Sequence, residues 1–84
     1  EISYPYPNPF NPSTSINFGL PSSSEVNINA YDIMGRQVST ILSERLREGY
    51  HQINWKPVNL SSGIYFINIK ANENDFTYKV MFIK

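Results

Sequence analysis

The sequence predicts an all-β protein, specifically an antiparallel immunoglobulin-like β-sandwich of about seven strands. Apolar and polar residues alternate with a period of two along most of the chain, and turn-forming residues recur about every 8–12 positions. Hydrophobic residues make up 40% of the chain and aromatic residues 14%, which favours a compact core over disorder. Because the chain has no cysteine, we expect the sandwich architecture without its common disulfide.

The first element is a proline-rich lead-in, residues 1–12, which we expect to act as a strand or linker from an upstream domain; residues 13–84 form the sandwich. Each proline fixes φ near about −65° and removes a backbone donor, which excludes a helix or a central strand. The rings of Tyr4, Tyr6 and Phe10 have large apolar areas to bury. We therefore prefer an ordered segment strapped onto the core. A free linker, or a ligand for a partner's aromatic groove, is the alternative.

The next two strands, residues 16–20 and 25–32, alternate most cleanly. Each has one apolar face, made of Ile16, Phe18 and Leu20 in the first and of Val26, Ile28 and Ala30 in the second. Such a pattern is typical of strands that bury one face and expose the other to water.

The segment after Gly35 is ambiguous. Gly35 suits a turn with positive φ, and a strand over residues 36–43 would return from it. Residues Val38, Ile41 and Leu42 also fit helical spacing, so residues 37–47 could form a short helix. We prefer the strand, followed by a charged loop over residues 44–48, because Gly35 and Gly49 leave little room for a stable helix.

Three further strands are expected at residues 50–56, 64–71 and 76–84. Trp55, at the end of the first of these, is expected at the centre of the core. Residues 72–75 close a hairpin between the last two strands, and we expect Asn74 or Asp75 to adopt left-handed geometry there.

Composition and motifs argue against chemistry in this domain. Seven basic and seven acidic residues balance to zero, so nothing suggests nucleic acid or an anionic membrane as a partner. No apolar run approaches the ~20 residues that span a bilayer. His51 has no nucleophile motif around it, and residues 72–75 match no calcium loop. We therefore expect no catalytic residue, cofactor or metal site. The tyrosines leave a carbohydrate-binding module as an alternative, with a stacking platform made of Tyr4, Tyr6, Tyr31 and Tyr50.

The ordered motifs of the chain resemble a known family. Tyr-Pro-Asn-Pro-Phe-Asn-Pro at 6–12 is followed by Val-x-Ile-x-Ala-Tyr-Asp-Ile-Met-Gly-Arg at 26–36, by Leu-Ser-Ser-Gly-Ile-Tyr-Phe at 60–66, and by a lysine-flanked end at 79–84. This set resembles the type A C-terminal sorting domain (the Por secretion tail) of the type IX secretion system. It is also similar to the related immunoglobulin-like domain of flagellar hook-capping proteins. The family-motif residues, expected to be structural, are Tyr6, Pro7, Asn8, Pro9, Phe10, Asn11, Pro12, Asp32, Gly35, Arg36, Ser62, Gly63 and Tyr65.

The resemblance implies a non-enzymatic sorting signal at the end of a larger exported protein. In such a protein of Bacteroidetes-type bacteria, the domain would direct an upstream cargo domain from the periplasm across the outer membrane, for release or attachment at the cell surface. A shuttle protein and a sortase would be its partners. The residues expected to be recognised are Lys79, Val80, Met81, Phe82, Ile83 and Lys84. The alternative is a structural accessory domain that packs on its neighbour, in which these lysines only discourage edge pairing.

Overall fold

The structure, a computed structural model, describes residues 4–84 and contains six strands and no helix within them. The strands are β1 (Thr14–Leu20), β2 (Ser24–Tyr31), β3 (Gln37–Leu46), β4 (Gly49–Trp55), β5 (Gly63–Ala71) and β6 (Asn74–Phe82). The predicted fold class, an all-β immunoglobulin-like sandwich, is confirmed.

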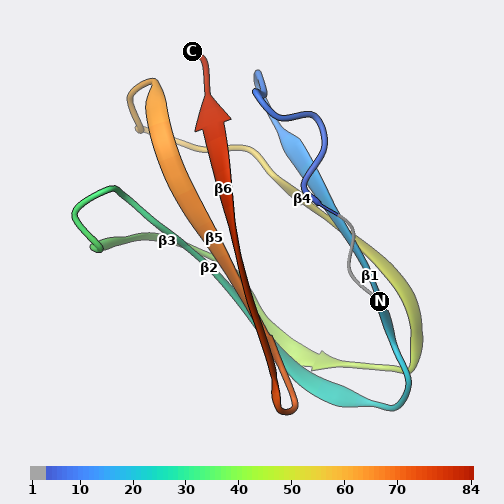
Figure 1. The fold of residues 1–84 in the computed structure, drawn as a ribbon. Coiled ribbons are helices and arrows are strands. Elements are labelled where there is room, and N and C mark those ends of the chain that lie inside the picture. The colour runs from blue at the N-terminus through green and yellow to red at the C-terminus, as the bar shows by residue number, and fades with distance from the viewer. Residues whose placement is uncertain (1–3) are drawn as a thin grey trace.

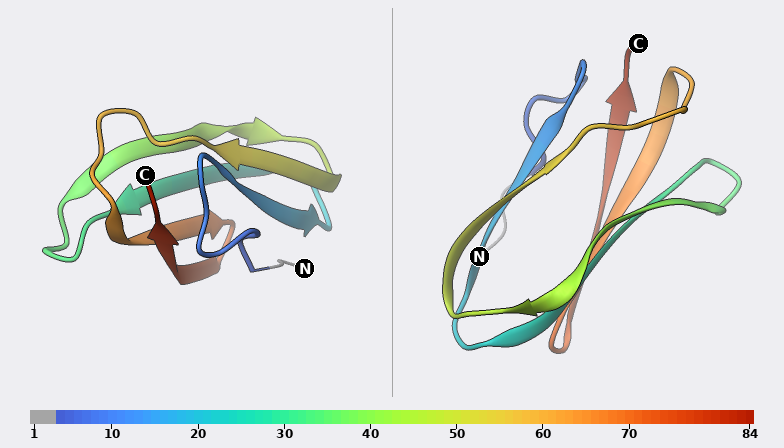
Figure 2. Two further views of the ribbon diagram at one scale, coloured as in Figure 1. Left: turned by 90° about the horizontal axis from the view of Figure 1, so that it is seen from above. Right: turned by 180° about the vertical axis from the view of Figure 1, so that it is seen from behind.

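Two antiparallel sheets form the sandwich (Figures 1 and 2). The smaller sheet pairs β1 with β4, and the larger has the order β3-β2-β5-β6. β2 and β5 are paired with each other. The hairpin of β2 and β3 therefore lies beside the hairpin of β5 and β6 in one layer. The β6 strand and the C-terminus lie at one edge of the larger sheet, close to the proline-rich lead-in (Figure 1).

The core lies between the sheets and follows the period-two pattern of the sequence. Alternate residues of β1, β2 and β5 are buried, whereas their neighbours are half-buried or exposed. Trp55 is buried as expected, and its ring contacts those of Phe10 and Tyr65. The buried hydrophobic residues are Phe10, Ile16, Phe18, Leu20, Val26, Ile28, Ala30, Trp55, Tyr65, Ile67, Ile69, Ala71, Val80 and Phe82.

The lead-in is not a continuous strand but makes two isolated bridges, one to each sheet. Tyr6 pairs with Ser15 of β1 through two backbone hydrogen bonds of 3.0 and 2.9 Å, and Phe10 pairs in parallel with Phe82 of β6. The expectation that the three aromatic rings of the lead-in are buried is correct for Phe10, which is 2% exposed, and wrong for Tyr4 and Tyr6, which are 79% and 77% exposed. Backbone pairing, which sequence composition does not report, holds Tyr6 in place.

The β3 strand explains the ambiguous spacing after Gly35. It runs to Leu46, so the expected charged loop over residues 44–48 is wrong for its first half. Two register shifts against β2 leave Val38 and Ile41 as extra residues on β3. Each extra residue moves the apolar pattern by one position, which produces the helix-like spacing in a strand.

The hairpin between β5 and β6 also differs from the expectation. Its pairing ends at Ala71 and Asn74, so the turn residues are Asn72 and Glu73. Asn72 has the positive φ, 58°, rather than Asn74 or Asp75, because a two-residue connection requires it in the first turn position. The Nδ2 of Asn72 also donates to Ser24 Oγ at 2.7 Å, which ties the turn to the start of β2.

Candidate functional site

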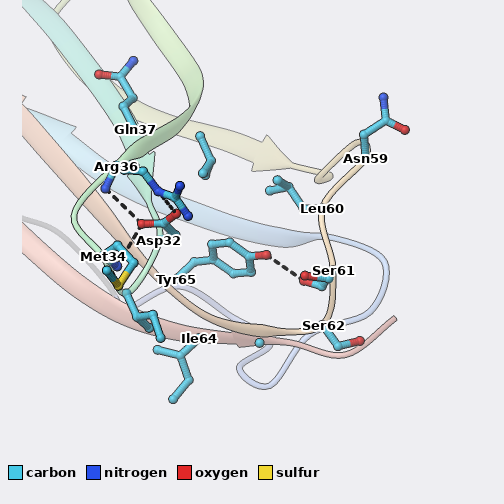
Figure 3. Close-up of a pocket in the computed structure, with 13 residues that line it drawn as sticks. Asp32, Met34, Arg36, Gln37, Asn59, Leu60, Ser61, Ser62, Ile64 and Tyr65 are labelled. Carbon is cyan, nitrogen blue, oxygen red and sulfur yellow. Dashed lines mark hydrogen bonds and ion pairs between the residues drawn. The ribbon is translucent and has the colours of Figure 1, made fainter.

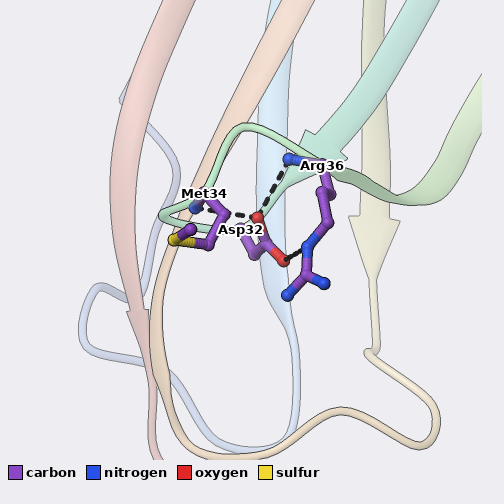
Figure 4. Close-up of polar contacts among 3 residues, drawn as sticks. All are labelled: Asp32, Met34 and Arg36. Carbon is purple, nitrogen blue, oxygen red and sulfur yellow. Dashed lines mark hydrogen bonds and ion pairs between the residues drawn. The ribbon is translucent and has the colours of Figure 1, made fainter.

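The turn between β2 and β3 is built around the Asp32 carboxylate (Figure 4). Its Oδ1 accepts hydrogen bonds from the backbone N–H groups of Met34 and Arg36, both at 2.9 Å. Its Oδ2 accepts from Nε of Arg36, also at 2.9 Å. Gly35 has φ +83°, which supplies the left-handed residue that the sequence predicts. The motif residues Asp32, Gly35 and Arg36 thus form a single closed turn.

These bonds change the acidity of the carboxyl group. The hydrogen bond from the Arg36 backbone is the largest influence on this group. Together with the bonds from Met34 and from the Arg36 side chain, it holds the pKa of Asp32 below its usual 3.8, although desolvation, the second-largest influence, raises it. Each donor favours the charged form, which is the one that accepts hydrogen bonds. The turn is therefore completed by an ionised Asp32.

A hollow of about 620 Å³ separates this turn from the loop that precedes β5 (Figure 3). The turn contributes Asp32 and Arg36, and the loop and β5 contribute Ser62, Gly63 and Tyr65. The phenolic O–H of Tyr65 donates to the Ser61 carbonyl at 2.7 Å, which braces the loop. Two motifs that lie about thirty residues apart in the sequence therefore meet at one end of the sandwich.

Exposed apolar side chains lie beside this hollow, at positions not predicted from the sequence as site residues. Ile33 and Met34 are exposed at the tip of the turn and line the hollow. The middle of a turn usually has polar residues. The apolar pair at this position could therefore have indicated a contact surface. Gly35 lies outside this hollow and lines a shallower one on the outer face of the larger sheet.

The C-terminal residues are divided between the core and the surface. Val80 and Phe82 are buried, whereas Met81 and Ile83 are 42% and 47% exposed. The backbone N–H of Lys84 donates to Ser62 Oγ at 2.8 Å, which links the C-terminus to the motif before β5. The recognition residues predicted from the sequence therefore do not form one surface, since two of the six point inward.

The lead-in motif lies against this same end of β6. The Asn8 side chain bonds to the backbone of Lys79 and Met81, and the Phe10 ring packs on Phe82 with centroids 5.2 Å apart. Pro7 is bound to β1 instead, through its carbonyl, which accepts from Thr14 Oγ1 at 2.8 Å. The two ends of the motif set, first and last in the sequence, are thus in direct contact.

The groups considered for chemistry are not brought together. His51 lies on β4, where its ring stacks on Phe18 and its Nε2 is 2.7 Å from the Arg47 carbonyl oxygen. Within residues 4–84, no three His, Cys, Asp or Glu side chains are placed to hold a metal ion. Tyr31 and Tyr50 project from the outer faces of different sheets, so the four tyrosines do not share one platform.

Comparison with known proteins supplies the family. A family model described as a secretion system C-terminal sorting domain matches residues 5–84. The chain belongs to this family. No curated protein and no solved structure gave a significant match.

The family gives the domain its general role. It is a C-terminal sorting signal of the type IX secretion system, a class that is non-catalytic in general, and it marks a protein exported to the cell surface or the extracellular space. The sorting domain interacts with the secretion machinery and belongs to a cargo chain. Among the residues that the structure describes, no helix is long and apolar enough to cross a membrane.

Proposed function

We propose that this sorting domain directs an upstream cargo domain of the same chain from the periplasm across the outer membrane, for release or attachment at the cell surface. The observation that carries the proposal is the family match over residues 5–84. Residues 1–12 would connect the cargo to the sandwich, and residues 13–84 would act as the signal. The domain acts by binding, with a shuttle protein and a sortase of the outer membrane as its partners.

The terminal segment, residues 79–84, is the proposed recognition element. Its outward residues combine two apolar side chains, Met81 and Ile83, with the exposed ammonium groups of Lys79 and Lys84. Val80 and Phe82 hold the segment in place from inside the core. A partner would therefore contact the outward residues on a strand that the fold keeps extended.

The test separates recognition from folding. The chain is fused to a periplasmic reporter and expressed in a host with a type IX system, and reporter at the cell surface is compared with reporter in the periplasm. A deletion of residues 79–84 would also remove Val80 and Phe82 from the core, so the informative variant replaces only Lys79, Met81, Ile83 and Lys84 with serine. The matched control replaces Tyr50 and Val58, which are also exposed, with serine.

The expected result is surface delivery of the unsubstituted fusion and of the control, and periplasmic retention of the variant. If the unsubstituted fusion stays in the periplasm, the sorting function is wrong. If the serine variant is delivered as well as the control, the domain is a sorting signal whose recognition element lies elsewhere.

A further inference from the structure

The outer edge of β6 is covered by the lead-in at every second residue. Asn8 Nδ2 donates to the Lys79 carbonyl at 3.0 Å, and Asn8 Oδ1 accepts from the Met81 N–H at 2.9 Å. The Met81 carbonyl then accepts from the Phe10 N–H at 2.9 Å, and the Ile83 N–H donates to the Phe10 carbonyl at 3.0 Å. These are the positions at which a neighbouring strand would bond to β6.

The two halves of this cover are held differently. Phe10 bonds through its backbone and buries its ring between Trp55 and Phe82. Asn8 bonds through its side-chain amide, whose N–H and C=O take the place of the backbone N–H and C=O of a paired strand. Both Asn8 and Pro9 are exposed. The cover therefore has one end fixed in the core and one end held by two exposed hydrogen bonds.

A hollow of about 230 Å³ lies beside the weakly held half. The lead-in contributes Asn8 and Pro9, and the sheet contributes Ile64 and Met81, with Lys79 also lining it. Ile64 is half-buried and Met81 is partly exposed. The hollow can thus receive an apolar side chain next to a positive charge.

We propose that the edge of β6 at Lys79–Met81 is a strand-addition site, and that Asn8 is its removable cover. The occupant is an extended segment of a secretion-machinery protein, with an apolar side chain for the hollow and an acidic side chain for Lys79. Its backbone N–H and C=O replace the amide of Asn8 one for one, so no β6 group loses its partner in the exchange. This inference rests on the proposed sorting function and specifies how the terminal segment is bound.

A disulfide that locks the cover provides the main test. Pro9 and Met81 line the same hollow, and each adjoins one residue of the parallel bridge between Phe10 and Phe82. Because the chain has no cysteine, Pro9→Cys with Met81→Cys gives a single defined cross-link, which the oxidising periplasm maintains. The control cross-link joins Asn17→Cys to Gln52→Cys, which are directly paired and exposed on the smaller sheet.

The locked reporter fusion is expected to lose surface delivery at least tenfold relative to the same double variant kept reduced with dithiothreitol, while the control cross-link has no effect. Non-reducing electrophoresis verifies each cross-link, and circular dichroism verifies folding. If the locked fusion is delivered as well as the reduced double variant, Asn8 is not a cover that must be removed, and the inference is overturned. If the fusion with the unsubstituted domain is itself not delivered, the sorting function fails instead, so the two failures are distinguishable.

Removal of the cover provides the second test. In Asn8→Ala, amide hydrogen exchange at Met81 should accelerate at least tenfold, whereas exchange at Ile83 stays within about twofold, because Phe10 still holds that residue. Export of the Asn8→Ala fusion should equal or exceed that of the unsubstituted fusion. Loss of export would show that Asn8 is itself recognised and would overturn the inference, as would dimerisation of the variant, which would assign the edge to a second copy of the chain.

Discussion

Replacement of Phe10 by alanine tests whether the lead-in is part of the folded domain. The ring is 2% exposed, with its centroid 5.7 Å from that of Trp55 and 5.2 Å from that of Phe82. Truncation of a buried phenylalanine costs about 3–5 kcal/mol in the free energy of unfolding. A domain of 84 residues has a total of about 4–13 kcal/mol. Phe10→Ala should therefore remove a large fraction of the stability of the domain.

The assay is urea unfolding followed by the fluorescence of Trp55, the single tryptophan of the chain, and by far-ultraviolet circular dichroism. A loss of 3 kcal/mol or more corresponds to a fall in Tm of at least about 12 °C for a domain of this size. Tyr6→Ala is the control in the same segment, because its ring is 77% exposed and surface substitutions usually change stability by at most about 0.5 kcal/mol.

The reasoning would be refuted if the free energy of unfolding of Phe10→Ala lay within about 1 kcal/mol of that of the unsubstituted protein. A loss of that size is ordinary for any substitution. The lead-in would then contribute little to the stability of the sandwich, and its ring would be dispensable to the core. Equal losses in Phe10→Ala and Tyr6→Ala would contradict the division of the segment into one buried and one exposed ring.

Three further changes test the turns. Asp32→Asn should lower the urea midpoint of unfolding above pH 4. Because folding depresses the pKa of Asp32 below 3.8, the carboxylate stabilises the fold above that value, and the difference in midpoint between the two proteins should narrow as pH falls through the folded pKa. A difference that does not change with pH would contradict this. Gly35→Ala places a side chain at φ +83° and should cost about 1–2 kcal/mol, measured by urea unfolding, whereas Gly35→Asn should cost less because asparagine tolerates that region. Asn72→Gly keeps the positive φ but loses the bond to Ser24, so its Tm should lie between those of the unsubstituted protein and Asn72→Ala. A Tm of Asn72→Gly below that of Asn72→Ala would show that the positive φ does not limit stability at this turn.

The strands with clean alternation were predictable because each has one face in the core. Ile16, Ile28 and Ile67 follow the period of two and are fully buried. On β3 the strand was predicted correctly from the limits set by Gly35 and Gly49, although bulges at Val38 and Ile41 interrupt its alternation. Such a bulge depends on pairing with β2, which a local window of sequence does not contain.

The candidate site was predictable only where its contacts are local. Asp32, Gly35 and Arg36 lie within five residues, so their turn could be read from residue types. Asn8 contacts Lys79 and Met81 across more than seventy positions. Nothing near Asn8 indicates that partner, because the contact follows from how the chain closes on itself.

The parallel pairing of the lead-in with β6 determines how the domain responds to tension. The two segments run in the same direction, so a force applied through the N-terminal side of the lead-in and through Lys84 pulls them past each other along their length (Figure 1). The bonds of Asn8 and Phe10 to the edge of β6 then carry the load together. A sideways force on Asn8 would instead break its bonds before those of Phe10. The same contact therefore resists a pull along the chain while yielding to lateral displacement.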